Sequence, residues 1–180
     1  MKTPLVMTII GEDKPGLVDA ISKIVADCGG NWLESRMAHL GGHFAGILRL
    51  DIDEEARDGL LASLRGLESR GLTVVVREDE GKPVPRPSHA AVLEVVGQDR
   101  PGIIRSISHA LASHAVNVEE LTTECYSAPM TGELLFRAKA FLRIPDDGNL
   151  HDLRADLEKL ADELMVDLSL QESIRNMAET

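Results

Sequence analysis

Two short turns carry the residue types best suited to hold a small molecule. Residues 13–16 read Asp-Lys-Pro-Gly and residues 99–102 read Asp-Arg-Pro-Gly. A proline is tolerated where a helix begins, an aspartate side chain can accept bonds from the free amides of the first turn, and a glycine leaves the backbone uncovered. Since a helix N-terminus carries free N–H donors and partial positive charge, each turn suits a carboxylate group.

The same turns also have a purely structural interpretation, because an aspartate cap and a first-turn proline make a good helix start without any ligand. The glycine that follows the proline favours binding. A glycine inside the first turn of a helix costs about 1 kcal/mol of helix propensity relative to alanine. Gly16 and Gly102 both accept this cost at the same place. Both interpretations stay open from the residues alone.

The turns belong to an internal repeat that organises the chain. Residues 11–34 and 97–120 align without a gap at an offset of 86 residues, with nine identical positions. Repeats are sought first because a missed repeat leads to the wrong fold. The identical pairs are Gly11/Gly97, Asp13/Asp99, Pro15/Pro101, Gly16/Gly102, Ile21/Ile107, Ser22/Ser108, Ala26/Ala112, Asn31/Asn117 and Glu34/Glu120.

Each repeat predicts the same succession of elements. A β-rich run leads into the turn, and an apolar stripe with helical spacing follows it. A hairpin, a leucine-rich helix and an alternating strand complete the unit. The order β-α-β-β-α-β, present twice, predicts an α+β fold of two ferredoxin-like domains, each a four-stranded antiparallel sheet with two helices on one face.

The predicted boundaries follow from the repeat and from a proline-rich stretch between its copies. Pro83, Pro85 and Pro87 make that stretch stiff and extended. We therefore expect a first domain over residues 1–78, a linker over 79–88, a second domain over 89–173 and a C-terminal tail over 174–180.

Composition narrows the classes of function. The 180 residues carry a formal net charge of −11 and only 3% aromatic residues, which argues against direct nucleic-acid binding. We find no secretion signal and no apolar segment long enough to span a membrane. The two distant cysteines, Cys28 and Cys125, form no metal or disulfide motif, so we expect reduced thiols and a cytoplasmic protein.

We find no motif for catalysis, and no cofactor is indicated. The chain contains no P-loop, no HExxH motif and no Ser/His/Asp arrangement. His39 and His43 flank the hairpin turn and could meet across the strands, but a third metal ligand is not apparent. Trp32 is more often a core or interface anchor than a stacking platform for a ligand.

With the two turns and the β-α-β-β-α-β order, the chain resembles the ACT domain family, whose ferredoxin-like modules commonly bind amino acids where two domains pair. Residues 127–132, Ser-Ala-Pro-Met-Thr-Gly, and then Leu135-Phe136 look like the segment that joins the middle strands of the second ACT domain in the glycine cleavage system transcriptional repressor family. The first unit has the tight Gly41-Gly42 hairpin there instead, so the two sites are not expected to be equivalent.

The resemblance places the family's ligand loop on both turns, and the strand-opening asparagines complete the two candidate pockets. From the residues alone, each asparagine could equally well only turn the chain. The candidate ligand-binding residues are Asp13, Lys14, Pro15, Gly16, Leu17, Asn31, Asp99, Arg100, Pro101, Gly102, Ile103 and Asn117.

The resemblance implies a regulatory protein without catalysis. It would sense an amino acid, with glycine the first candidate, and act on transcription through a protein partner such as a transcription activator. A homodimer is expected, since such sheets leave strand edges exposed. Two alternatives remain: a ligand-free ACT adaptor or regulatory subunit of a metabolic enzyme, and a stand-alone enzyme.

Overall fold

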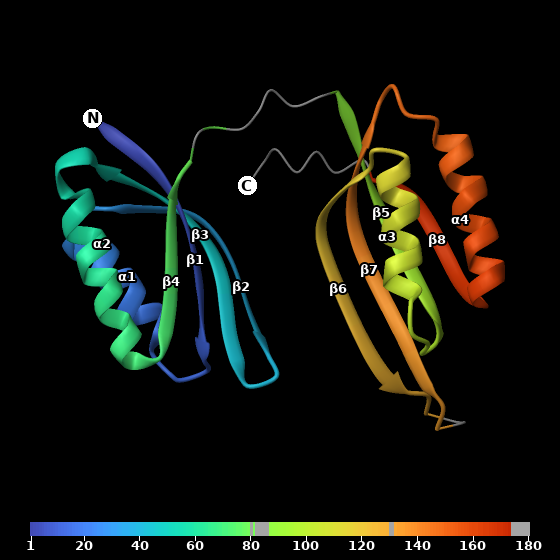
Figure 1. The fold of residues 1–180 in the computed structure, drawn as a ribbon, viewed down its shortest axis with the longest axis horizontal. Helices are drawn as coiled ribbons and strands as arrows, with labels where there is room; N and C mark the ends of the chain where they lie inside the picture. Colours follow the sequence, from blue (N-terminus) through green and yellow to red (C-terminus); the bar gives the residue numbers. More distant parts are fainter. Residues whose placement is uncertain (80, 82–86, 130–131, 174–180) are drawn as a thin grey trace. The chain divides into compact units, whose positions relative to one another are not determined.

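The computed structural model describes residues 1–79, 81, 87–129 and 132–173. The chain divides into two compact units, residues 1–83 and 84–180, and the division falls within the predicted linker. Pro83 and Pro85 of that linker, and the predicted tail over 174–180, lie outside the described residues. Figure 1 shows that each unit has its own sheet and its own pair of helices.

The first unit contains one four-stranded sheet and two main helices. Its strands run in the order β2-β3-β1-β4, and every neighbouring pair is antiparallel. A short 3₁₀ turn, Glu54–Ala56, leads into the second helix. The elements are β1 (Lys2–Glu12), α1 (Leu17–Asp27), β2 (Asn31–Leu40), β3 (His43–Asp53), α2 (Arg57–Arg65) and β4 (Leu72–Glu78).

The second unit repeats this topology, with the strand order β6-β7-β5-β8. Its elements are β5 (Ser88–Gln98), α3 (Ile103–Ser113), β6 (Asn117–Ser127), β7 (Leu134–Pro145), α4 (Leu150–Leu164) and β8 (Val166–Ser173). The predicted fold class, two ferredoxin-like β-α-β-β-α-β domains, is confirmed. Ser88, which was expected to end the linker, is the first residue of β5.

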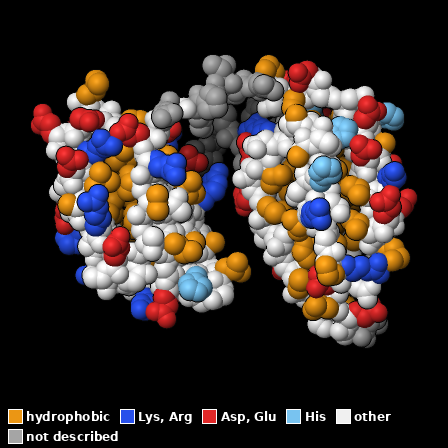
Figure 2. Space-filling model, viewed as in Figure 1, with side chains coloured by type: hydrophobic (Ala, Val, Ile, Leu, Met, Phe, Trp, Pro, Cys, Tyr) orange, Lys and Arg blue, Asp and Glu red, His pale blue; other side chains and the backbone are white. Residues whose placement is uncertain are grey.

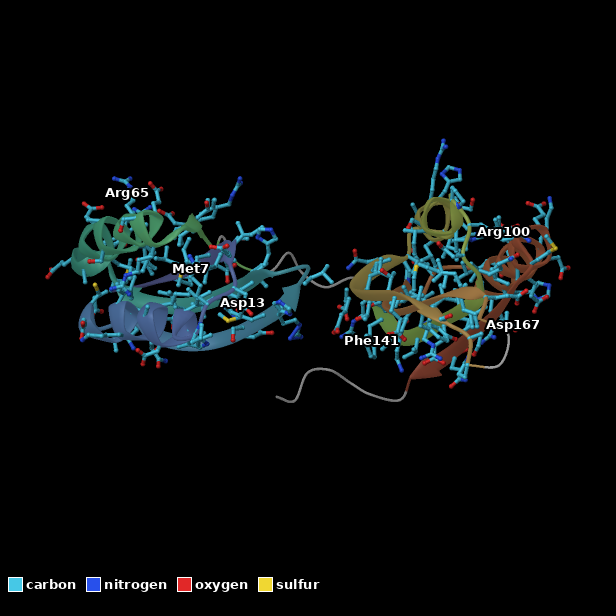
Figure 3. The ribbon with its side chains drawn as sticks, turned by 90° about the horizontal axis from the view of Figure 1, so that it is seen from below. Met7, Asp13, Arg65, Arg100, Phe141 and Asp167 are labelled. Atoms are coloured by element: carbon cyan, nitrogen blue, oxygen red, sulfur yellow. The ribbon has the colours of Figure 1, made fainter. Side chains whose placement is uncertain are left out.

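Each unit has a separate apolar core between the helices and one face of the sheet. In the first unit, alternate residues of β1 and β3 point into this core, as the period of a strand requires. Met7 is among those that are completely buried, and it lies inside the unit in Figure 3. Leu157 of α4 has the same degree of burial in the second unit. The other face of each sheet carries no helix (Figure 1).

The ends of the helices explain two details of the sequence. Gly29 follows α1 in the left-handed conformation that glycine adopts without strain, with φ of 73°, and Gly30 N donates to Val25 O at 2.8 Å. Helix α2 ends at Arg65, so Leu67 lies beyond it. Leu67 lies in a 3₁₀ segment, Gly66–Arg70, and is still buried.

The first glycine of the repeat has a packing role. A Cβ at Gly11 would lie 2.5 Å from Gly71 O and 2.7 Å from Leu72 Cδ2, where β4 begins beside β1. The equivalent Gly97 is in the same position against Val166, at 2.6 Å from Cγ1. Both units therefore need a residue without a side chain where the last strand joins the sheet.

We expect Gly11→Ala to lower the free energy of unfolding of the first unit by about 1–3 kcal/mol, because its methyl group would overlap backbone that cannot move freely. Gly59→Ala is the matched control. Gly59 is exposed within α2, has no atom within 4 Å of an added Cβ, and its replacement should add up to about 1 kcal/mol. Urea unfolding measures both. Equal stabilities of the two variants would contradict the packing role.

Candidate ligand site

Each turn places a left-handed glycine directly before a helix. Gly16 precedes α1 with φ of 88°, and Gly102 precedes α3 with φ of 99°. These glycines are N-caps rather than residues of the first helical turn, which corrects the sequence interpretation. Glycine is required there because other residues rarely adopt a positive φ. Consequently Pro15 and Pro101 lie one residue before the N-cap and not at the first helical position.

Neither helix start is capped by a side chain. The predicted caps, Asp13 and Asp99, make no capping hydrogen bond to α1 or α3, so that part of the prediction is wrong. In α4, by contrast, the Asn149 side chain accepts bonds from two amides of the first turn. The N-cap of α1 and of α3 is thus a glycine without a capping side chain, whereas the N-cap of α4 is an asparagine whose side chain caps the helix.

The uncapped starts leave backbone donors available. The first backbone bond of α1 runs from Ala20 N to Gly16 O at 2.9 Å, so the N–H groups of the three preceding residues have no helical acceptor. In α3, Ser106 N bonds to Gly102 O at 3.0 Å in the same way. No atom lies within 4 Å of a Cβ built on either glycine. A small anionic group could therefore approach these amides closely.

A backbone bond ties each turn to the neighbouring hairpin. Asp13 N donates to Gly42 O at 3.0 Å, and Asp99 N donates to Leu134 O at 3.1 Å. These bonds hold the beginning of each turn against the end of the hairpin that β2 and β3, or β6 and β7, form. Asp13 and Arg100 are labelled in Figure 3, each at the turn of its own unit. The turn residues that the sequence predicted as a group do lie together, because they are consecutive.

The basic residue of each turn is held by the residue two positions earlier. Lys14 Nζ lies 2.7 Å from Glu12 Oε2, and this hydrogen bond, together with the lysine charge, lowers the pKa of Glu12. Arg100 donates to Gln98 Oε1 at 3.1 Å. The same arrangement therefore has a charged acceptor in the first unit and a neutral one in the second.

Each turn aspartate also meets one residue that the sequence analysis did not include in the site. His39 Nε2 lies 3.7 Å from Asp13 Oδ2. In the second unit Asp99 is near enough to the Cys125 thiol for its negative charge to raise the pKa of that thiol. His39 and Cys125 are separated by the same 86 residues as the two turns, so the repeat offset was the signal that could have found them.

The strand-opening asparagines do not lie near the turn of their own unit. Asn31 is paired with Asp51, whereas the turn follows Glu12, which is paired with His43 at the opposite end of β3. Because β2 spans ten residues, about 30 Å separates Asn31 from this turn. Asn117 begins β6 and has the same relation to the second turn. The structure thus does not bring the two parts of each predicted pocket together within one unit.

The apolar residue after each glycine is part of the core. Leu17 is 9% exposed and Ile103 is 2% exposed. Their side chains anchor the first turn of each helix, so a ligand at the turn would meet their backbone amides. Ligand binding by any of the predicted residues, the asparagines included, stays a prediction.

The histidines near the hairpin are not arranged as a metal site. His39 is paired with Phe44 rather than with His43, so the two imidazoles do not face each other directly across the strands. Over the described part of the chain, no three His, Cys, Asp or Glu side chains form a group that could hold a metal ion. Likewise, none of the described helices is long and apolar enough to cross a membrane.

Comparison with known proteins defines the class. A family model described as ACT domain matches residues 3–77 and matches again at residues 89–171. These matches cover most of the chain and coincide with the two sheets and their helices. The chain belongs to the ACT domain family and contains two copies of the domain.

The relatives include a regulator of transcription. The glycine cleavage system transcriptional repressor of Escherichia coli (strain K12) is 30% identical to this chain over 126 residues, which are 69% of this chain and 66% of the repressor. The match thus spans just under two thirds of that protein's length.

Solved structures agree with the tandem fold. The crystal structure of an unknown protein from Galdieria sulphuraria superposes with a TM-score of 0.83 at 27% identity, over 97% of this chain and all of the other. A candidate glycine cleavage system transcriptional repressor superposes with a TM-score of 0.69 at 20% identity, over 96% of this chain and 98% of the other. The second likeness concerns the fold alone.

Cys125 offers a chemical test of the second turn. Although Cys125 is exposed, partial desolvation of its thiol is the largest cause that raises its pKa, and the charge of Asp99 raises it further. A raised pKa keeps the thiol protonated and slows its alkylation at pH 8. In a Cys28→Ser background, we expect Asp99→Asn to speed alkylation of Cys125 severalfold, measured with iodoacetamide by mass spectrometry.

The matched control is Asp13→Asn in the same background. Asp13 is the equivalent aspartate of the first unit, and its replacement should leave the alkylation rate of Cys125 unchanged. Equal rates in the Asp99 variant and the parent protein would contradict the contact between Asp99 and Cys125.

Proposed function

We propose that this protein is a cytoplasmic sensor of an amino acid that regulates transcription through a protein partner and has no catalytic activity of its own. The observation that carries the proposal is the pair of uncapped helix starts, each opened by a left-handed glycine. Free amides at a helix N-terminus are suited to an amino-acid carboxylate. Glycine is the first effector to test, because the Escherichia coli relative is a glycine cleavage system repressor.

The second turn is the stronger candidate for a carboxylate. Gln98 stands where the first unit has Glu12, and Arg105 of α3 stands where α1 has Asp19. Both differences make the surroundings of the second turn more positive. A negative charge near a helix N-terminus is stabilised by typically about 0.3–1 kcal/mol, and neighbouring carboxylates oppose it. We therefore assign the tighter site to the second unit.

Regulation requires that the effector changes the affinity for a partner. A ligand can shift such an equilibrium only by its difference in affinity between two states. In this proposal, the amino acid binds at a turn while two ACT units pair, and Asn31 or Asn117 would then reach a turn of another unit. The partner would be a protein such as a transcription activator. The formal charge of −11 supports action through a protein rather than through DNA.

Calorimetry on the full chain tests the proposal. We expect glycine or another small amino acid to bind, and we expect Gly102→Ala to weaken binding more than Gly16→Ala does. Either alanine would strain a left-handed backbone position and place a methyl group beside the free amides. A loss of at least about tenfold in affinity is expected for Gly102→Ala, which is about 1.4 kcal/mol.

The control is Gly29→Ala. Gly29 also has a positive φ, of 73°, and also has open space around an added Cβ, but it lies at the opposite end of α1. Its replacement should cost stability without changing affinity. If none of the twenty common amino acids binds, sensing is wrong and the ligand-free adaptor or regulatory subunit becomes the better description. Turnover of any substrate would contradict the absence of catalysis.

A further inference from the structure

The helix-free face of the first sheet is apolar at its centre. Its central row of cross-strand neighbours begins at Arg36 on the edge strand and runs through Ile47 and Thr8 to Val75. Ile47 is 50% exposed and Val75 is 49% exposed, and Ile10 on the same face is 50% exposed. A group of large aliphatic side chains that are half exposed on one face is unusual for a surface that meets only water.

In the second unit the equivalent central row is polar, although Val92 and Phe141 form an apolar pair next to it on the same face. The row equivalent to Ile47, Thr8 and Val75 consists of Lys139, Glu94 and Ser169. Lys139 Nζ lies 2.8 Å from Glu94 Oε1, and this ion pair lowers the pKa of Glu94. Since the two units share one fold, the apolar row of the first unit is not a requirement of the fold.

We propose that the helix-free face of the first unit packs against the same face of a second copy of this chain. Two sheets that pack face to face bury their facing side chains about 10 Å apart. A two-fold arrangement would place the Ile47 row of one copy on that of the other, as an isologous interface requires. This pairing does not depend on an effector at the turns.

The charged residues on the helix-free face of the first unit are compatible with packing against the same face of a second copy. Among the described residues they are nearly balanced, with four basic and five acidic side chains, although the chain as a whole is strongly acidic. They surround the apolar row, and Arg49 Nε already lies 2.8 Å from Asp79 Oδ2 within one copy. A rim that carries nearly equal numbers of both signs can pair across a two-fold axis with little net repulsion. The charged residues are Lys2, Arg36, Arg49, Arg77, Glu12, Glu34, Asp51, Asp53 and Asp79.

The surface is also hollowed. A depression of about 290 Å³ lies on this face, with the aliphatic side chains of Val6 and Ile47 in its lining and Arg36 and Asp79 among the charged residues there. A face of four strands, each about seven residues long, covers on the order of 500 Å². That is below the roughly 800 Å² per partner of a standard interface, so a reversible dimer in the micromolar range is expected.

The decisive variant copies the second unit into the first. Thr8→Glu together with Ile47→Lys recreates the Glu94–Lys139 pair, which the same fold already accommodates. We expect the full chain to be a dimer, and we expect the double variant to raise its dissociation constant at least about tenfold in sedimentation equilibrium. If the double variant fails to fold, as judged by circular dichroism, Val75→Ser tests the same row by copying Ser169.

The control is Leu121→Lys on the edge strand β6, where Leu121 is 46% exposed. It should leave the dissociation constant unchanged. A wild-type chain that stays monomeric up to about 1 mM would overturn the proposal, and so would a dimer that the row variants do not weaken. A dimer that Leu121→Lys dissociates equally well would favour pairing through strand edges and would also overturn it.

Discussion

A left-handed residue before the first helix of each unit is the constraint on which the candidate site depends. The chain must leave β1 or β5, cross the end of the sheet and enter a helix within a few residues. The positive φ of Gly16 and Gly102 makes that reversal without a side chain over the helix start. The cost is that amides of the first turn lack an intramolecular acceptor. The fold therefore creates a donor group that water or a ligand must satisfy.

Both copies of the repeat keep the left-handed glycine before the first helix, but the residues around it differ. The first turn is flanked by Glu12 and faces His39, whereas the second is flanked by Gln98 and faces Cys125. The central rows of the helix-free faces differ as well, since one contains Ile47 and Val75 and the other contains the Lys139–Glu94 ion pair. Figure 2 shows charged side chains of both signs over the visible surface of each unit. The two domains thus share a scaffold and differ in the chemistry that they present.

The sequence predicted the fold because the repeat and the apolar periodicities agree with each other at every element. The sequence-based predictions were wrong where the three-dimensional arrangement determines a helix boundary or which residues lie close together. The boundary of α1 moved by two residues because Gly16 adopts a left-handed N-cap, and residue types alone cannot distinguish this from a glycine in the first turn. The family resemblance placed Asn31 in the pocket of the first turn, whereas the strand register places it at the far end of the sheet.

His39 and Cys125 were missed for a related reason. They are different residue types, so a search for identical positions passes over them, although the repeat offset relates them. Whether the helix-free faces pack against another surface could not be predicted from the sequence either. Alternating patterns specify which residues face away from the core but not what covers them.

The central claim is that the free amides in the first turns of α3 and α1 receive the effector. Backbone ¹⁵N–¹H NMR of the full chain, titrated with glycine and then with the other small amino acids, reports each amide separately. The account predicts saturable shifts at Ile103, Ile104 and Arg105, at lower ligand concentration than at Leu17, Val18 and Asp19. Saturable shifts confined to other parts of the chain, or no shifts with any amino acid, would contradict it.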